Sequence, residues 1–504
     1  MSDTPRSFFA ASRLVLIPTL VLLFGLGFGV RLIDATDLPL DFHPTRQLLS
    51  ALKARGMYYQ TAPDVPDWQR EMSLQQWKTK AEVEPEVLEG LVAFTYRLTG
   101  EQLWVARVYS SLFWSIGGIF LFLLIRNLVS LDGAVIASAY YLFLPYAVIA
   151  SRSFQPDPLM VMLILIFWWA VERWGRSESW PAALLAGLAG GFAIFIKFVA
   201  AFFVVGAALG FVLGRFDVRR LLRQPQVWVM AALGLLPSAV YIFFGVVLHG
   251  FLGRQFSGRF IPALLLSPAN YMAWAVNANM AAGGVAIMLG LSGLFFVRER
   301  SIRSFLFGLW GAYLVFGLVF DYHIATHDYY HLPLIPIVAV SLAPLADAFL
   351  ARLADLAATR RLRLAVLGIL LYGLLSGVGV VRNQMKSIDY RPQAALWVEI
   401  GDRLEHGKHV IALTQDYGSR LAYWGWQTAE SWPNSGDVDY HTARGASYKF
   451  DEMFARLTQN KHYFLVTDFD ELSRQPDLKA RLAGFSVSAQ GEGYVIYDLS
   501  QPLK

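Results

Sequence analysis

The stretch LVLIPTLVLLFGLGFGV, Leu14–Val30, carries no charged side chain. It is followed at once by RLIDATDLPLDFHPTRQ, Arg31–Gln47, which carries three aspartates, one histidine and two arginines. A run of roughly 17–25 apolar residues is long enough to cross the hydrocarbon core of a membrane. The two stretches together therefore predict a membrane anchor that opens directly into a polar segment.

The composition of the whole chain agrees with a membrane protein. Of its 504 residues, 56% are hydrophobic and only 16% are charged, which is too apolar for a soluble enzyme of this length. About eleven runs are long enough to span a membrane. They are Leu14–Val30, Leu103–Ile125, Gly133–Ala150, Pro158–Val171, two crossings within Trp180–Leu213, Val227–Leu248, Tyr271–Val297, Phe305–Phe320, Leu332–Phe349 and Leu364–Val381.

Arginines in the connecting loops predict the orientation. With the N-terminus inside, the short outside loops hold only Arg152, Arg254 and Arg259. The alternate loops hold many more: Arg126, Arg173, Arg176, Arg215, Arg219, Arg220, Arg223, Arg298, Arg300, Arg303, Arg352, Arg360, Arg361 and Arg363. Because cytoplasmic loops carry the excess of positive charge, we expect a cytoplasmic N-terminus and a multi-pass protein of the plasma membrane, such as a bacterial inner membrane. No small-residue cleavage site follows the first run, so we expect it to be retained as an anchor.

The last 120 or so residues differ from the rest of the chain. Residues 385–504 carry 13 Lys and Arg against 16 Asp and Glu and no spanning run. The segments HVIALTQDYG, HYFLVTDFDEL and GYVIYDLS resemble short strands separated by helical patterns such as DLKARLAGF. We therefore expect a membrane domain at 1–384, whose first outside loop covers about 31–102, and a small extracytoplasmic α/β domain at 385–504.

Several function classes are excluded or disfavoured. The chain has no cysteine, which excludes disulfides, thiolate metal ligands and a cysteine nucleophile. Its glycine-rich stretches GLGFG and GLAGG lie inside apolar helices and not between a strand and a helix, as a nucleotide-binding loop would. The positive charge lies in the inside loops, so it gives no reason to expect nucleic-acid binding.

Ionisable residues gather on the predicted outside face. The first outside loop carries acidic residues and a histidine, and later outside segments add an aspartate, a lysine, two arginines and a histidine-tyrosine cluster. These residues are Asp34, Asp37, Asp41, His43, Arg46, Glu84, Glu86, Glu89, Asp157, Lys197, Arg254, Arg259, His323, His327, Asp328, Tyr329, Tyr330 and His331. Inside loops offer mostly arginine. Because the ionisable residues gather on one face, we expect the chemistry to take place at the outer surface of the membrane.

Each candidate also has a purely structural interpretation. Asp34, Asp37 and Asp157 are suited to cap helices, and the cluster from His323 to His331 fits a hydrated loop. Lys197 is different, because a lysine within an apolar stretch costs several kcal/mol unless it reaches the interface or an anion. Three histidines and an aspartate at irregular spacing match no specific metal signature, so we predict no metal site.

The order of these motifs resembles the GT-C glycosyltransferases, and within them the protein O-mannosyltransferases and the aminoarabinose transferases of lipid A. The resemblance rests on the acidic first loop, Glu84-Pro85 before the second span, Arg107 within that span, Pro-Asp-Pro around Asp157, the lone Lys197 and a tyrosine before Leu-Pro at Tyr330. It covers roughly residues 10–380.

The resemblance implies transfer of a sugar from a polyprenyl-phosphate carrier to an acceptor outside the membrane. Asp41 matches the family's acidic first-loop residue, although His43 follows where many members have an Asp-Glu pair. Asp157 matches the second acidic residue. Lys197, Tyr330 and Arg259 look like the groups that hold the carrier phosphate, with Arg254 an equal candidate for the arginine. Glu84 stands where members often have lysine or histidine before proline, and His327 lies beside Tyr330.

The chemistry is consistent with these residue types. A carboxylate such as Asp41 can take the acceptor proton as general base, while Lys, Arg and a tyrosine hydroxyl stabilise the departing phosphate. We expect no required cofactor, although a divalent metal is compatible with the reaction. The expected partners are a polyprenyl-phosphate-linked sugar, a protein, lipid or cell-envelope glycan acceptor and the bilayer. A flippase for a lipid-linked sugar and a non-catalytic envelope-assembly protein remain the alternatives.

Overall fold

The computed structural model describes residues 7–9, 13–80, 84–253, 260–356 and 360–502. The chain forms two compact units. The first contains residues 1–35, 82–88 and 104–388, and the second contains residues 36–81, 89–103 and 389–504.

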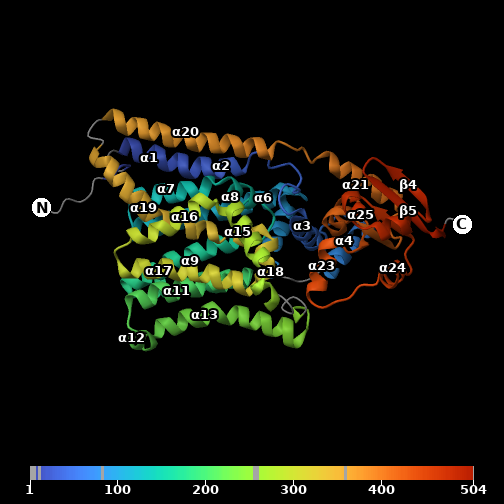
Figure 1. Ribbon diagram of the computed structural model, residues 1–504, viewed down its shortest axis with the longest axis horizontal. Helices are drawn as coiled ribbons and strands as arrows, with labels where there is room; N and C mark the ends of the chain where they lie inside the picture. Colours follow the sequence, from blue (N-terminus) through green and yellow to red (C-terminus); the bar gives the residue numbers. More distant parts are fainter. Residues whose placement is uncertain (1–6, 10–12, 81–83, 254–259, 357–359, 503–504) are drawn as a thin grey trace. The chain divides into compact units, whose positions relative to one another are not determined.

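The first unit is built from apolar helices that run alongside one another (Figure 1). Long helices are broken by short π- or 3₁₀-helical turns or by glycine and proline. The elements are α1 (Arg13–Val21), η1 (Leu22–Leu26), α2 (Gly27–Arg31), α6 (Trp104–Leu128), α7 (Leu131–Phe143), α8 (Pro145–Ala150), α9 (Asp157–Ser177), α10 (Trp180–Ile196), α11 (Ala200–Arg215), α12 (Val218–Leu222), α13 (Pro225–Ile242), η2 (Phe243–Leu248), η3 (Pro262–Leu266), α15 (Pro268–Ala282), α16 (Gly284–Gly293), η4 (Leu294–Phe296), α17 (Arg300–Val319), α18 (Asp321–Thr326), η5 (Asp328–His331), α19 (Leu334–Leu356) and α20 (Arg360–Met385).

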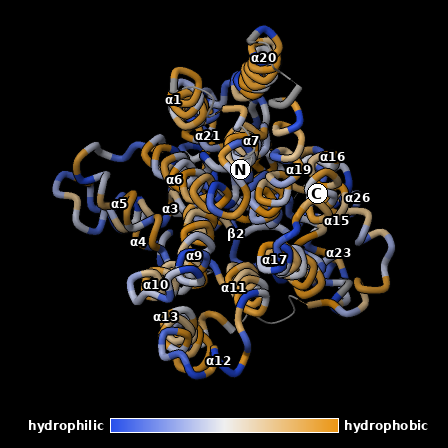
Figure 2. The backbone as a smooth tube through the Cα atoms, turned by 90° about the vertical axis from the view of Figure 1, so that its left-hand side faces the viewer, coloured by the Kyte–Doolittle hydropathy of each residue, from blue (hydrophilic) through white to orange (hydrophobic). Residues whose placement is uncertain are grey.

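Seven helical segments in the described residues are long and apolar enough to cross a membrane, or eight if the pair Pro268–Ala282 and Gly284–Phe296, bent by 87°, is one broken span. Three further apolar helices, Leu131–Phe143, Trp180–Ile196 and Ala200–Arg215, are shorter. Hydrophobic residues are frequent in these helices (Figure 2). The chain is an integral membrane protein, and every run expected from the sequence is helical. The count of eleven crossings stays a prediction, because the shorter helices do not by themselves reach a full span.

Helices α11 and α17 approach closely through glycines. A Cβ atom added at Gly308 would lie 2.3 Å from the carbonyl oxygen of Gly206, and one at Gly210 would lie 2.6 Å from the carbonyl oxygen of Ser304. Small residues allow the two backbones to meet, which is a common way to pack helices in lipid. An apolar groove of about 670 Å³ runs along the same two helices, from Phe198 to Leu213 on one side.

The second unit contains a five-stranded sheet with helices around it. Three helices come from the segment between the first two spans: α3 (Pro44–Tyr59), α4 (Asp67–Thr79) and α5 (Val87–Thr99). The remainder is α21 (Pro392–Arg403), β1 (Val410–Leu413), η6 (Gln415–Gly418), α22 (Ser419–Trp424), β2 (Ala429–Ser431), α23 (Ser435–Ala443), α24 (Phe450–Thr458), β3 (Tyr463–Val466), α25 (Phe469–Arg474), α26 (Pro476–Leu482), β4 (Phe485–Gly491) and β5 (Tyr494–Pro502).

The sheet has the strand order β2-β1-β3-β5-β4. The first three strands are parallel, with Ile411 opposite Phe464, whereas β5 pairs antiparallel with β3 and β4. The expected strands at β1, β3 and β5 and the helix at α26 are confirmed. The short β2, three residues long, was not predicted, because only its place beside β1 makes it a strand.

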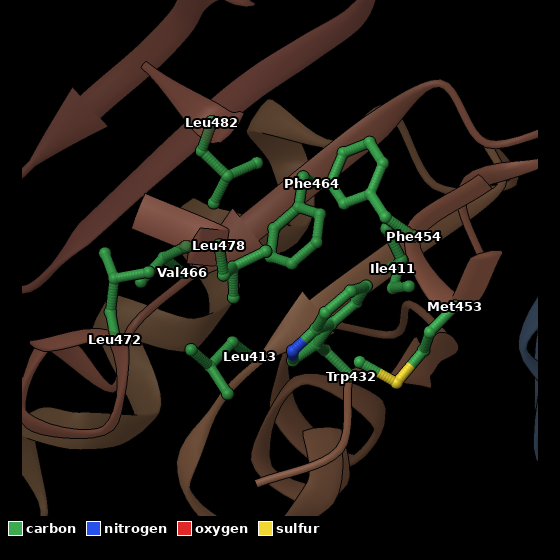
Figure 3. Close-up of a cluster of buried hydrophobic side chains, with 10 residues drawn as sticks. All are labelled: Ile411, Leu413, Trp432, Met453, Phe454, Phe464, Val466, Leu472, Leu478 and Leu482. Carbon is green, nitrogen blue, oxygen red and sulfur yellow. The ribbon is translucent and has the colours of Figure 1, made fainter. Parts of the chain in front are cut away.

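One face of the sheet supports a compact core. Ile411, Phe464 and Val466 from the strands pack with Trp432, Phe454 and Leu478 from surrounding segments, and all are less than 6% exposed. Figure 3 shows Trp432 within this cluster, beside Leu413, Ile411 and Met453. A second cluster, with Trp397, Leu421, Leu465 and Ile496, covers the other face. Buried on both sides, the parallel strands β1 and β3 consist of apolar residues, whereas the edge strand β2 has the sequence Ala-Glu-Ser.

The helices of the first-loop segment are tied to the rest of this unit by Arg55 of α3. Its guanidinium carbon lies 3.9 Å from the ring centroid of Tyr423 and 4.3 Å from that of Trp426. The Arg55 side chain also donates to the Tyr423 carbonyl at 2.7 Å and lies 3.6 Å from Glu101. The Tyr423 hydroxyl donates to Glu101 at 2.5 Å. Together these contacts join α3 and α22 to Glu101, which lies two residues after the end of α5.

Candidate functional site

The centre of the candidate site in the first unit is a buried ion pair. The Lys197 ammonium lies 2.9 Å from Oδ1 and 3.0 Å from Oδ2 of Asp157. Their side chains are 6% and 1% exposed. Two charges this deeply buried are stable only because each compensates the other. The sequence separately predicted both residues as site residues, and the structure brings them into contact.

Local structure explains why these two side chains reach one point. Asp157 is the first residue of α9, where Pro156 and Pro158 allow a helix to begin but not to extend backwards. Lys197 follows the last residue of α10 and has extended backbone angles, so the chain turns there before α11. Both charged groups therefore lie at helix ends, away from the middle of any apolar helix.

Two tyrosines complete the surroundings of the ammonium. Its nitrogen lies 5.0 Å from the ring centroid of Tyr329 and 5.1 Å from that of Tyr330. Both tyrosines belong to η5, and each is less than 8% exposed. A cation within about 6 Å of an aromatic ring is attracted by the negative face of the ring. The predicted Tyr330 is therefore beside Lys197, and Tyr329 is an additional neighbour.

The expected His327 is close to the same tyrosines but is more exposed. Its ring centroid lies 6.0 Å from that of Tyr330 and 5.7 Å from that of His323, and its Nδ1 is 2.8 Å from the Thr326 hydroxyl. His331 is instead buried and held on both ring nitrogens, by the Tyr313 hydroxyl and by the Ile324 carbonyl. His327 is thus the histidine of this loop better suited to meet a ligand.

Two polar residues near Asp157 were not singled out from the sequence. Tyr146 of α8 interacts with Asp328 and with Asp157. Gln155 is fully buried two residues before Asp157, and within the described residues neither its Oε1 nor its Nε2 has a hydrogen-bond partner. A buried amide without a partner costs about 1–3 kcal/mol, so it calls for an explanation. The position of Gln155 directly before Pro-Asp-Pro was the feature of the sequence that could have indicated it as a site residue.

Glu84 lines a small cavity together with residues that flank Lys197 in the sequence. That cavity, about 30 Å³, is lined by Glu84, Phe195, Phe198, Ser238 and Tyr241. Phe195 and Phe198 flank Lys197 in the sequence. The candidate phosphate-binding residues Arg254 and Arg259 lie outside the described residues.

Asp41 and His43 belong to the second unit. Asp41 is half-buried, and the Gln47 amide donates to its Oδ1 at 3.4 Å. His43 has a positive φ of 43° immediately before α3, and its ring meets Phe42 edge-on. Burial raises the pKa of Tyr390, and the negative charge of Asp41 acts in the same direction. Tyr390 is a further residue that the sequence did not indicate.

Asp37 is a structural residue. It is 4% exposed, and its carboxylate accepts the backbone N–H groups of Leu38 at 2.8 Å and of Tyr390 at 3.1 Å. These bonds fix the chain at the start of the C-terminal segment. Among the described residues, no group of three or more histidine or acidic side chains is placed to hold a metal ion.

Comparison with known proteins identifies the fold. Residues 84–244 match the family described as dolichyl-phosphate-mannose-protein mannosyltransferase. The structure of ArnT from Cupriavidus metallidurans bound to undecaprenyl phosphate has a TM-score of 0.60 at 15% identity, covering 97% of this chain and 98% of that chain. The archaeal oligosaccharyltransferase AglB from Archaeoglobus fulgidus, in complex with an inhibitory peptide and a dolichol-phosphate, has a TM-score of 0.54 at 12% identity, covering 94% and 73%. No curated protein matches. The chain has the GT-C fold, and the resemblance seen in the sequence is confirmed.

Proposed function

We propose that this GT-C membrane protein transfers a sugar from a polyprenyl-phosphate carrier to an acceptor on the extracytoplasmic side. The observation that carries the proposal is the buried pair of Lys197 and Asp157 between Tyr329 and Tyr330. The family match over residues 84–244 and the fold shared with ArnT, crystallised with undecaprenyl phosphate, support the donor class. The fold by itself does not determine chemistry, so the argument rests on the site.

Lys197 has the capacity to bind the carrier phosphate while it remains paired. An ammonium has three N–H donors, and the two Asp157 oxygens accept at most two of them here. One donor is left for a phosphate oxygen. The Lys197 ammonium has already lost its water on folding. The ammonium is therefore preorganised to stabilise the negative charge that grows on the phosphate as the glycosidic bond breaks. The Tyr330 hydroxyl, and Arg254 or Arg259, are proposed to share this role.

The prenyl tail of the donor needs an apolar surface next to the phosphate site. The groove along α11 and α17 begins at Phe198, the residue after Lys197, and continues to Leu213. A helix rises 1.5 Å per residue, so the groove is about 20 Å long. A phosphate bound at Lys197 would therefore have a continuous apolar path for its lipid.

The reaction also needs a general base that activates the acceptor. In the proposed reaction, Asp41 takes the proton of the acceptor nucleophile, whose lone pair forms the new bond to the anomeric carbon. The bond from that carbon to the phosphate oxygen breaks, and its electron pair stays on the phosphate. Asp157 holds Lys197 and is proposed to position the substrate. His43, His327 and Glu84 are proposed as further substrate-binding residues. No separate acid is needed, because the leaving group is a phosphate.

Transfer from defined donors tests the proposal. Purified protein in nanodiscs would be given a panel of radiolabelled polyprenyl-phosphate sugars together with cell-envelope extract as acceptor. We expect loss of carrier-linked label with one donor class, and a rate at least 100-fold lower in Asp41→Asn. Asp64→Asn is the matched control, since Asp64 is an exposed aspartate of the same first-loop segment. It should retain the full rate.

The same experiment separates the alternatives. A flippase would move the labelled donor between leaflets without breaking its glycosidic bond, and an assembly protein would bind without turnover. If no donor is consumed by the wild-type protein, or if Asp41→Asn and Asp64→Asn transfer equally fast, the transferase proposal with Asp41 as base is wrong.

A further inference from the structure

The second unit has a polar cavity at the carboxyl edge of its parallel strands. Strands β2, β1 and β3 run in the same direction and end at Ser431, Leu413 and Val466. The loops that follow them enclose a cavity of about 300 Å³. In open sheets of this kind, ligands bind in the crevice beyond the carboxyl ends of the strands. The volume is at the lower end of the range for small-molecule sites.

The loop after β1 forms one wall. Asp416 and Tyr417 have positive φ angles of 62° and 54°, and Gly418 continues the turn at 73°. The turn is closed by the Gly418 N–H, which donates to the Thr414 hydroxyl at 2.8 Å, and by the Ser431 hydroxyl, which donates to the Tyr417 carbonyl at 3.2 Å. This wall is therefore held to β2 and is preorganised.

The opposite wall is held by Glu471 of α25. Its carboxylate accepts the backbone N–H of Ser435 at 2.6 Å, the Ser435 hydroxyl at 3.1 Å and the Gln475 amide at 2.8 Å. Trp432, which belongs to the core cluster, lines the cavity, and its indole N–H donates to Gln475 at 2.7 Å. The hydrogen bonds of Glu471 thus hold this wall of the cavity in place.

The charges of the residues that line the cavity restrict which class of ligand it can bind. Its ionisable side chains are Asp416, Asp468, Glu471 and the single cation Arg474. With all four charged, the lining has an excess of two negative charges, which Arg420 reduces to one through its ion pair with Asp416. The remaining negative charge disfavours phosphates and carboxylates. Asp416 is paired with Arg420, and Oδ1 of Asp468 accepts the Glu471 N–H at 3.0 Å. The second Asp468 oxygen has no partner among the described contacts and is the acceptor best placed for a ligand.

We infer that this cavity binds a sugar residue that is neutral or carries an amine. Carboxylates accept pairs of hydroxyl or ammonium donors, and Tyr417, which lines the cavity and is 43% exposed, supplies aromatic surface for the apolar face of a sugar ring. The inference does not depend on transfer chemistry, because the cavity is made entirely by residues of the second unit. If the protein is a transferase, this site would engage a glycan acceptor through a sugar other than the reacting one.

Calorimetric titration of the full chain tests the inference. The protein would be held in nanodiscs, since detergents with sugar headgroups would occupy the cavity. The probes are glucosamine, glucose, glucuronate and inorganic phosphate. We expect saturable binding of glucosamine and glucose, with glucuronate and phosphate at least tenfold weaker. Binding of glucosamine should weaken at least tenfold in Asp468→Asn, which keeps the helix cap because asparagine caps as well as aspartate.

Asp470→Asn is the matched control. Asp470 lies on the same helix, is exposed and does not line the cavity, so this change removes the same charge without touching the ligand. Glucosamine should bind to it as to the wild-type protein, and also to Asp157→Asn, which separates this site from the proposed transfer site. The inference is overturned if neither glucose nor glucosamine binds, if phosphate or glucuronate binds as tightly, or if Asp468→Asn and Asp470→Asn behave alike.

Discussion

Lys197 and Asp157 are 40 residues apart in sequence, yet the Lys197 ammonium lies within 3.0 Å of both oxygens of the Asp157 carboxylate. Asp157 begins α9 and Lys197 follows the end of α10, so both charges lie at helix ends. Removing one member of such a pair leaves an uncompensated buried charge. Replacing both with neutral residues removes that problem. Stability and activity can therefore be separated at this site.

Single substitutions of the pair should destabilise the protein much more than the double substitution. Asp157→Asn or Lys197→Met alone should lower the free energy of unfolding by about 3–5 kcal/mol, because one charge stays buried without its partner. The double variant Asp157→Asn/Lys197→Met should recover most of that loss. Transfer should be at least 100-fold slower in all three. Thermal unfolding and donor turnover, measured on the same samples, check this. A double variant that regains activity along with stability would show that the pair is only structural.

Replacing Gln155 with an apolar residue should not destabilise the protein. Its buried amide has no partner in the described residues, so Gln155→Leu should leave stability unchanged or raise it by about 1–2 kcal/mol. We expect the amide to meet a polar group of the substrate, in which case the same change raises KM about tenfold. Thermal unfolding and initial rates measure the two effects. Unchanged kinetics in a stabilised variant would mean that the amide has no role in binding substrate.

The sequence predicted the membrane helices well because a run of apolar residues is a local signal. The apolar stretch Trp180–Leu213, expected to hold two crossings, contains the two helices α10 and α11 with Lys197 between them. The number of full crossings was harder to predict. Leu131–Phe143 is too short by itself, and whether α7 and α8 act as one span depends on the bend at Leu144 and Pro145. Such bends depend on tertiary packing.

The site was predicted only as a set of residue types on one face. Sequence reasoning selected Lys197 because a lysine within an apolar stretch is costly. It selected Asp157 and Tyr330 because Pro-Asp-Pro and a tyrosine before Leu-Pro resemble motifs of the GT-C enzymes. It could not pair Lys197 with Asp157, since the pairing depends on how α9 packs against α10. It also passed over Gln155, because an uncharged amide gives no signal until its burial is known.

The close packing of α11 and α17 should depend on Gly308. A Cβ atom there would meet the Gly206 carbonyl at 2.3 Å, so Gly308→Val must push the helices apart. We expect a loss of at least 1–3 kcal/mol in stability. Gly311 of the same helix has no neighbouring atom within 4 Å, and Gly311→Val should be nearly neutral. Thermal unfolding in nanodiscs compares the two, and equal losses would argue against the tight crossing.

Arg55 should stabilise the second unit through its planar guanidinium. It lies against Tyr423 and Trp426 and is 2% exposed, whereas Arg97 is exposed and 5.9 Å from Phe94. Arg55→Lys removes the stacking and the shared hydrogen bonds, so a loss of about 2 kcal/mol is expected. Arg97→Lys should have no measurable effect. Pulse proteolysis of the second unit in urea gives both values, and similar midpoints would contradict the role of Arg55.

Asp416 should make the stability of the second unit depend on pH. Burial raises the pKa of Asp416 despite its ion pair with Arg420 and its hydrogen bond from Thr45, and the charge of Asp468 acts in the same upward direction as burial. The folded state therefore keeps this proton at a pH where the unfolded state has lost it. Stability falls as pH rises from about 3.8, the ordinary value, through the raised pKa.

Asp416→Asn isolates this contribution, because asparagine also tolerates the positive φ of 62°. Below the ordinary pKa of an aspartate, the wild-type protein and the variant should be about equally stable. As pH rises toward 7, the variant should become the more stable of the two, since only the wild type must ionise a buried carboxyl. The measurement is the urea midpoint for proteolysis of the second unit across this range. If the wild type gains stability relative to the variant as pH rises, the Arg420 pair outweighs burial and the raised pKa is wrong.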